Sequence, residues 1–167
     1  MRFTTRQEIP APLPEVEDAL LDPAFLTRLA ELPRLGRPQL LGTEADGDEV
    51  RQRVRYRFSG DLSPAVTAVV DPGKLTWVEH TTYDRRRHRG EHRIVPDHYR
   101  DRLRASYTTQ LDEAAGTTQR RIEGELAVRF PLVGGRVERA IVSGLVEHAG
   151  LEAGVLAQWL TDRAEGG

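Results

Sequence analysis

The sequence contains no cysteine, and Lys74 is the only lysine among its 167 residues. The absence of cysteine excludes disulfide bonds, thiol catalysis and thiolate metal sites. No apolar run approaches the length of about 20 residues that spans a bilayer, so we expect no stable membrane insertion. The stretch from Met1 to Arg6 lacks the apolar core of a signal peptide, and the expected location is cytoplasmic.

The chain also lacks a large excess of one charge sign, because acidic residues offset 23 arginines and leave a net charge of −2. The run Arg85-Arg86-Arg87-His88-Arg89 is typical of a nucleic-acid patch. It falls at an expected hairpin tip, however, where solvated charge is ordinary, so we predict no nucleic-acid partner. His88 and His92 would lie about 13 Å apart on an extended strand, too far for one ion. With no phosphate loop or dinucleotide motif either, we expect neither a metal nor a cofactor.

The C-terminal part carries the most informative pattern. Residues 131–163 read as one long amphipathic helix. His148 and Glu152 fall at the centre of its apolar face, and buried charges need a partner. The apolar stripe itself is formed by Val133, Val137, Ile141, Leu145, Val155, Leu156, Trp159 and Leu160.

The preceding chain alternates apolar and polar residues, as strands do. Residues 2–9 form a first strand, and two short helices follow, around Val16–Leu20 and Phe25–Leu29. Further strands are expected at 39–44, 49–58, 65–70, 75–83, 87–95, 102–111 and 117–130. This order predicts an α+β fold, with a curved antiparallel sheet of seven or eight strands wrapped around the long helix. Residues 1–163 would form one domain, with 164–167 as a frayed tail.

The segment Ile9-Pro-Ala-Pro-Leu-Pro-Glu-Val-Glu-Asp-Ala-Leu-Leu-Asp-Pro-Ala-Phe-Leu resembles the opening of START/Bet v1-like (SRPBCC) proteins. The stretch Phe130-Pro-Leu-Val-Gly-Gly-Arg-Val-Glu is similar to the entry to the last helix in an uncharacterised bacterial branch of that superfamily. The resemblance implies a helix-grip fold with a cavity between sheet and helix. Its members bind lipids, sterols, plant hormones or polyketides, and a minority catalyse cyclisation. The superfamily shares no catalytic motif, so no catalytic residue is carried over.

Strand alternation places mixed apolar and polar side chains on the inner face, as in ligand pockets. We therefore predict binding of a small hydrophobic or amphipathic molecule, and the resemblance implies a lipid-like or polyketide-like one. The expected ligand-binding residues are Tyr56, Phe58, Trp77, Glu79, His92, Tyr107, Val137, Ile141, Leu145, His148 and Glu152. A solid, packed core remains open as an alternative, and so does the oligomeric state.

Several alternatives concern Glu152. It pairs with His148 or with an inward polar group of the sheet, or the helix bends near Gly144, Gly150 or Gly154 and turns it to solvent. An enzyme, cyclase- or hydrolase-like, would use Glu152 or His148 as general base, with burial raising the pKa of the carboxyl.

A third alternative is an interaction module with an outer arginine face. Two strand glycines, Gly90 and Gly124, are expected to mark bulges or bends.

Overall fold

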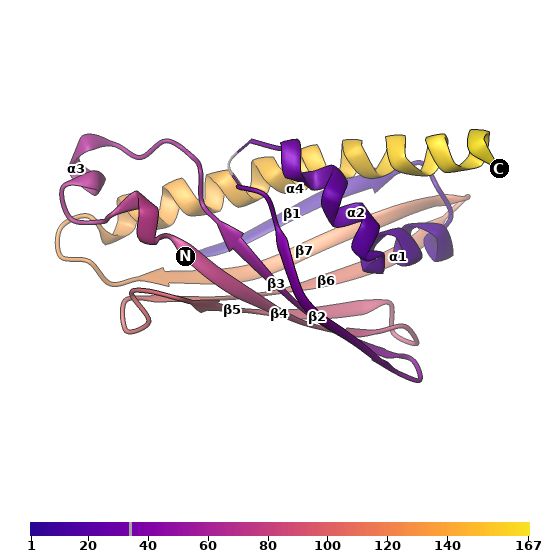
Figure 1. Cartoon of the computed structure of the whole chain (residues 1–167), viewed down its shortest axis with the longest axis horizontal. Coiled ribbons are helices and arrows are strands. Elements are labelled where there is room, and N and C mark those ends of the chain that lie inside the picture. The colour runs from indigo at the N-terminus through magenta and orange to yellow at the C-terminus, as the bar shows by residue number, and fades with distance from the viewer. Residues whose placement is uncertain (34) are drawn as a thin grey trace.

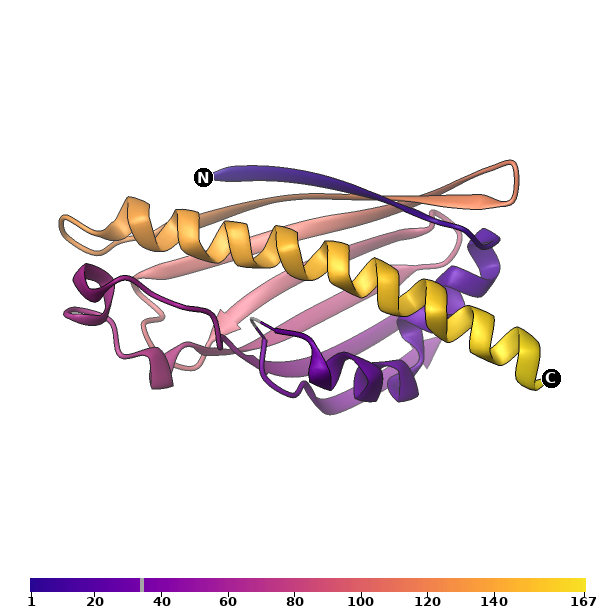
Figure 2. The ribbon, with the colours of Figure 1, turned by 90° about the horizontal axis from the view of Figure 1, so that it is seen from above.

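The computed structural model describes residues 1–33 and 35–167. It contains one seven-stranded antiparallel sheet in the order β1-β7-β6-β5-β4-β3-β2, with a long C-terminal helix lying across it (Figures 1 and 2). The sheet and the helix are therefore the two layers of the predicted helix-grip fold. The strands are β1 (Arg2–Ile9), β2 (Gln39–Asp46), β3 (Glu49–Arg57), β4 (Thr76–Asp84), β5 (Arg89–Pro96), β6 (Leu103–Ala114) and β7 (Thr117–Val128).

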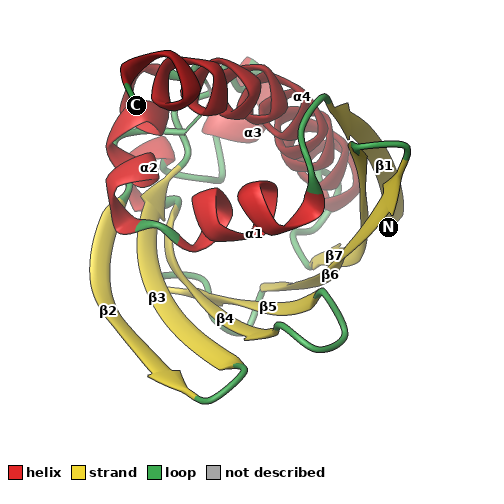
Figure 3. Ribbon diagram, turned by 90° about the vertical axis from the view of Figure 1, so that its right-hand side faces the viewer, coloured by secondary structure: helices red, strands yellow, loops and turns green. Residues whose placement is uncertain are grey.

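Two short helices separate the first two strands, as the sequence predicts. These are α1 (Leu13–Leu21) and α2 (Pro23–Arg28), and a single 3-10 turn, η1 (Leu29–Glu31), follows them. Asp22 ends α1 and caps α2, because its carboxylate accepts a hydrogen bond from the Ala24 N–H at 2.9 Å. Seen from the end, α1 lies across the space between the sheet and α4, and α2 lies between edge strand β2 and α4 (Figure 3).

Strand β3 shows why the sheet has a wet and a dry face. Val50, Gln52 and Val54 are buried, and the alternating arginines from Arg51 to Arg57 are exposed. Side chains on a strand alternate between faces, so this pattern fixes which face meets α4. The arginines of β3 consequently lie on the outer face of the sheet.

Helix α4 spans Gly134–Gly166, which shifts the expected 131–163 helix by three residues. Pro131 and Leu132 belong to a turn instead, and Leu132 has a φ of 68° with its side chain fully exposed. The helix is unbroken at Gly144, Gly150 and Gly154, and the side chain of Glu152 is 19% exposed, so the alternative in which Glu152 turns to solvent does not hold. It also continues through residues 164–166, where a frayed tail was expected.

Residues 65–70 are not a strand. Helix α3 (Pro64–Thr67) and a 3-10 turn, η2 (Pro72–Lys74), occupy this region. Pro64 suits the first turn of a helix, and Val66 and Val70, four residues apart, share one buried side. A short apolar run fits a strand and a buried helical turn equally well, which explains the error.

Gly90 and Gly124 are not bulges either, because the strand register is continuous at both. Within the described strands the register shifts only between Leu40 and Gly42. At Gly124, a Cβ would approach Phe3 Cζ and Tyr107 Cβ to 2.6 Å. The glycine therefore permits close packing across the inner face.

The apolar core forms two clusters at opposite ends of α4. One packs Ala153 and Leu156 against α1 and α2, together with Ile9 and Phe25. The other packs Val137 and Val142 against the region around α3. The middle of α4 lies between these clusters, and it carries the polar side chains of the candidate site.

By length and composition α4 is apolar enough to cross a bilayer, with a mean hydropathy of 1.3 over 18 residues. The expectation that no such stretch exists is therefore wrong. Because α4 contacts β1 and β7, it is the core helix of the fold, and its hydropathy is not evidence of a membrane span.

Candidate functional site

A cavity of about 200 Å³ lies between the inner face of the sheet and α4. A void that holds one water needs only about 10–15 Å³ of space open to the water centre. The cavity is therefore large enough for a small organic molecule. Its apolar lining comes from strands, α1, α2 and α4, and includes Leu20, Leu21, Phe25, Leu26, Val54, Ile94, Leu103, Ala105, Ile122 and Leu126.

Ten of the eleven residues predicted to bind ligand line this cavity. They are Tyr56, Phe58, Trp77, Glu79, His92, Tyr107, Ile141, Leu145, His148 and Glu152. The exception is Val137, which is 1% exposed and packed in the cluster near α3. Periodicity placed it on the correct helix face, but it lies beyond the end of the cavity.

One polar cluster joins α4 to β7. Arg120, 3% exposed, forms an ion pair with Glu152. Its other two nitrogens also donate, Nε to Gln7 Oε1 at 3.0 Å and Nη2 to the Ala149 carbonyl at 2.9 Å. We call Arg120, Glu152 and His148 the helix cluster. The predicted pairing of Glu152 with an inward polar group is thus observed.

His148 completes the helix cluster. Its Nε2 lies 3.6 Å from Glu152 Oε2, one helical turn away. Nδ1 is buried and has no hydrogen-bond partner in the described part of the chain.

Electrostatics argue against the alternative in which Glu152 acts as a general base. Burial alone raises the pKa of its carboxyl, but Arg120 and His148 outweigh burial and lower the pKa to about 2. A carboxylate with so low a pKa is a poor general base at neutral pH. The prediction of a raised pKa is wrong because it did not include Arg120.

A second polar cluster lies on the sheet, on β4, β5 and β6. His92 Nδ1 lies 3.0 Å from Thr81 Oγ1 and 3.2 Å from Glu79 Oε1. On the other side of the ring, His92 Nε2 lies 3.0 Å from Thr109 Oγ1. We call Glu79, Thr81, His92 and Thr109 the sheet cluster. It holds an imidazole between a carboxylate and a hydroxyl.

Neighbouring residues fix the His92 ring. It stacks on Tyr107 with ring centroids 4.1 Å apart and an interplanar angle of 5°. Beneath it, a Cβ on Gly90 would come within 2.8 Å of His92 Nε2. Gly90 therefore leaves the space in which the ring lies against the sheet.

Three aromatic side chains extend this polar region. Tyr56 stacks with Trp77 across neighbouring strands at a centroid distance of 6.0 Å. Burial raises the pKa of both Tyr56 and Tyr107 well above 10, and the nearby negative charge of Glu79 raises each further. Both hydroxyls consequently stay neutral, and they face the cavity as hydrogen-bonding groups.

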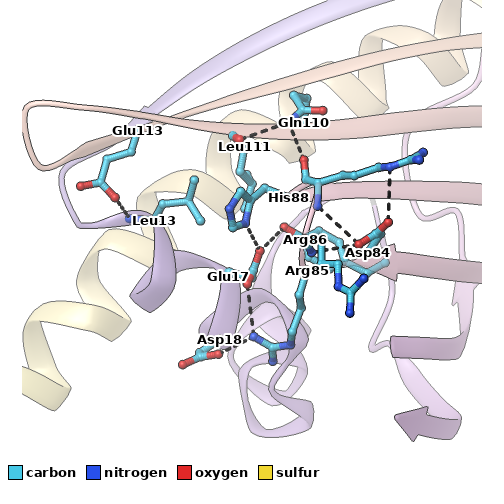
Figure 4. Close-up of polar contacts among 12 residues, drawn as sticks. Leu13, Glu17, Asp18, Asp84, Arg85, Arg86, His88, Gln110, Leu111 and Glu113 are labelled. Atoms are coloured by element: carbon cyan, nitrogen blue, oxygen red, sulfur yellow. Dashed lines mark hydrogen bonds and ion pairs between the residues drawn. The ribbon is translucent and has the colours of Figure 1, made fainter. Parts of the chain in front are cut away.

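A third polar cluster, which the sequence did not predict, lies between α1 and the turn that joins β4 to β5 (Figure 4). Glu17, 5% exposed, accepts a 2.6 Å hydrogen bond from the Tyr83 hydroxyl and lies 2.8 Å from His88 Nδ1. Arg85 lies 3.3 Å from Glu17 and 2.8 Å from Asp18. These contacts tie the β4–β5 hairpin to α1.

The same contacts revise the interpretation of the arginine run. Residues 85–88 form the turn between β4 and β5, as expected, but Arg85 and His88 are anchored to Glu17. Arg86 pairs with Asp48 at 2.6 Å. Over residues 1–33 and 35–167, no group of three His, Asp or Glu side chains is arranged to hold a metal ion.

Arg120 is the main site residue that sequence reasoning missed. A signal existed, because Arg120 has the same parity along the strand as the apolar residues Ile122, Leu126 and Val128. The arginines of β3 are exposed, and that pattern gave no reason to expect that Arg120 turns inward.

Several solved structures share this fold at low sequence identity. Protein TTHA0849 from Thermus thermophilus matches with a TM-score of 0.70 and 16% identity, covering 98% of this chain and 99% of that one. The Zhui aromatase/cyclase from Streptomyces sp. R1128 gives 0.68 and 15%, covering 98% and 95%. A point mutant of Thalictrum flavum norcoclaurine synthase, in complex with a transition-state analogue, gives 0.63 and 13%, covering 98% and 96%.

The sequence comparisons identify a family but no activity. No curated protein matches the chain. A family model described as "Protein of unknown function (DUF2505)" matches residues 4–160, which is nearly the whole chain. The chain therefore belongs to the DUF2505 family, and its architecture is the Bet v1-like (SRPBCC) helix-grip fold.

Proposed function

We propose that this protein binds a small hydrophobic or amphipathic molecule, lipid-like or polyketide-like, in the cavity between the sheet and α4. The cavity of about 200 Å³ carries this proposal, because its lining is mostly apolar and includes polar groups that could orient a ligand. Apolar burial would supply most of the affinity, at roughly 25 cal/mol per Å² before the costs of association. The two polar clusters would orient the polar end of the ligand.

Filling the cavity tests the proposal. N-phenyl-1-naphthylamine, an apolar fluorescent probe, is titrated into wild-type protein and Ala105→Trp. Ala105 lines the cavity from β6, so an indole there occupies the ligand space and weakens binding by about tenfold, equivalent to about 1.4 kcal/mol.

Ala127→Trp is the matched control, because Ala127 is exposed on the neighbouring strand β7. Thermal unfolding checks that both variants are folded. Absence of probe binding to the wild type, or equal binding to Ala105→Trp, would contradict the proposal. If the probe binds as expected, native mass spectrometry of protein purified from its own host would identify the natural ligand.

A second candidate function, acid–base catalysis, is favoured by the position of His92 between Glu79 and Thr109. In this arrangement the carboxylate orients the imidazole, whose other nitrogen accepts a proton. The test follows deuterium exchange at the carbons next to the carbonyl of 2-octanone in D₂O by NMR. Faster exchange with wild-type protein than with His92→Gln is the expected result, and no acceleration by the wild type excludes this function for that ketone.

The proposal includes a cytoplasmic location. Immunoblotting of cytoplasmic and membrane fractions from the native host checks it, and recovery in the membrane fraction would contradict it.

A further inference from the structure

The charges that line the cavity do not balance. Among the described lining residues, four carry a full charge: Lys74, Glu79, Arg120 and Glu152. Arg120 and Glu152 neutralise each other in the helix cluster. Lys74 is exposed at the rim, in the η2 turn. Glu79 is therefore the interior charge that lacks a permanent counter-charge.

The surroundings of Glu79 show what its carboxylate lacks. The side chain is 14% exposed, so little water reaches it. Its contacts are the Thr81 hydroxyl at 3.4 Å, His92 Nδ1 at 3.2 Å and the Tyr107 hydroxyl. No described arginine or lysine pairs with it. A buried carboxylate without a permanent counter-charge is costly, and a cation would relieve that cost.

Aromatic rings line the same region. Tyr56, Trp77 and Tyr107 all face the cavity, and the electrostatic influence of Glu79 reaches both tyrosine hydroxyls. Aromatic faces attract ammonium groups when water is excluded. A carboxylate beside aromatic rings therefore complements a positive charge better than a negative one.

Among the described residues that line the interior, an acidic head group would find no free cation. All the donor nitrogens of Arg120 are already engaged, by Gln7, Glu152 and Ala149. The remaining cation of the lining, Lys74, is at the rim, so a carboxylate ligand would have to stay at the entrance. Glu79 would repel any such group that entered further.

We propose that the cavity selects molecules with an apolar body and a protonated amine, with Glu79 as the counter-ion of the ammonium group. The inference rests on the proposed function, and it adds the chemical class of the ligand.

Three ligands of equal chain length test it: octylamine, 1-octanol and octanoate. Each is titrated by isothermal calorimetry at about pH 8, where imidazole groups are ordinarily neutral. We expect octylamine to bind at least about tenfold tighter than 1-octanol, and octanoate to bind most weakly. In Glu79→Gln the advantage of octylamine over 1-octanol is lost.

Glu91→Gln is the matched control, because Glu91 is exposed on β5, next to His92 in the chain. It should keep the full preference for octylamine. Tighter binding of octanoate, or an undiminished amine preference in Glu79→Gln, would overturn the inference. Octanoate binding that disappears in Lys74→Gln would assign the head group to the rim instead.

The two proposals fail separately. If N-phenyl-1-naphthylamine binds but octylamine neither displaces it nor binds better than 1-octanol, the amine inference is wrong and the proposed function stands. If the probe does not bind either, both are wrong.

Discussion

The helix cluster and the sheet cluster face the same cavity, but their charges are arranged differently. In the helix cluster Arg120 meets Glu152, and its other donors are satisfied by Gln7 and Ala149. In the sheet cluster the carboxylate of Glu79 meets only hydroxyls and an imidazole. A closed ion pair holds a structure together, whereas an unmatched charge leaves an interaction for a ligand to complete.

This difference assigns separate roles. The helix cluster joins α4 to β7 and thereby fixes the wall of the cavity. The sheet cluster lies on β4, β5 and β6, and its groups line the space where a ligand would lie. Changes in the helix cluster should therefore act mainly on stability, and changes in the sheet cluster mainly on binding.

The largest effect is expected from Arg120→Met. The substitution leaves Glu152 buried without its counter-ion, which typically costs about 3–5 kcal/mol. Urea unfolding measures the loss. Arg121→Met is the control, because its side chain is 42% exposed and pairs with Glu123 at 3.5 Å; we expect less than about 1 kcal/mol there. Equal losses would show that the helix cluster is not structural.

Acid should weaken the protein through the same pair. The pKa of Glu152 is lowered from 4.5 to about 2 on folding. A lowered pKa stabilises the folded state above about pH 4.5, and that contribution disappears as the pH falls towards 2. The loss is on the order of 3 kcal/mol.

The pH dependence of urea unfolding checks this loss. Glu152→Gln should flatten the dependence between pH 4.5 and 2 and also lower stability at neutral pH. Glu123→Gln, at an exposed carboxylate, should leave the slope as in the wild type. An unchanged slope in Glu152→Gln would contradict the assignment.

A smaller effect is expected from Gly90→Ala in the sheet cluster. The new Cβ would lie 2.8 Å from His92 Nε2, so the ring must leave Thr109. Such overpacking typically costs about 1–3 kcal/mol. Urea unfolding gives the cost, and the NMR shifts of the His92 ring should change. An unmoved His92 resonance would mean that Gly90 does not position the ring.

The smallest effect, with the opposite sign, is expected from Gly150→Ala. Gly150 is exposed on α4, and no neighbouring heavy atom would lie within 4 Å of its Cβ. Alanine should stabilise the helix by about 0.5–1 kcal/mol. Thermal unfolding measures the gain, and probe binding should stay unchanged. Destabilisation would indicate that α4 needs a glycine at this point.

Local patterns explain which parts of the fold were predictable. The strict alternation of β3 and the stripe along α4 each extend over many residues, so element type and inward face followed from periodicity. The segment 65–70 is too short for that signal, and Pro64 occupies the first turn of the helix that forms there instead. The start of α4 was predicted three residues too early, because Leu132 adopts a left-handed turn conformation that hydrophobic periodicity does not indicate.

By itself, the sequence determined the order of the seven strands and the long helix, the dry face of strands such as β3, and the inward position of His148 and Glu152. Hydrophobic periodicity is a local property of the sequence, so it indicates element type and inward face without contacts between distant segments. Only the tertiary structure decided that Arg120 neutralises Glu152 and that Glu79, His92 and Tyr107 gather from three strands. Strand register and the path of α4 determine these pairings, and both arise from contacts across the whole chain.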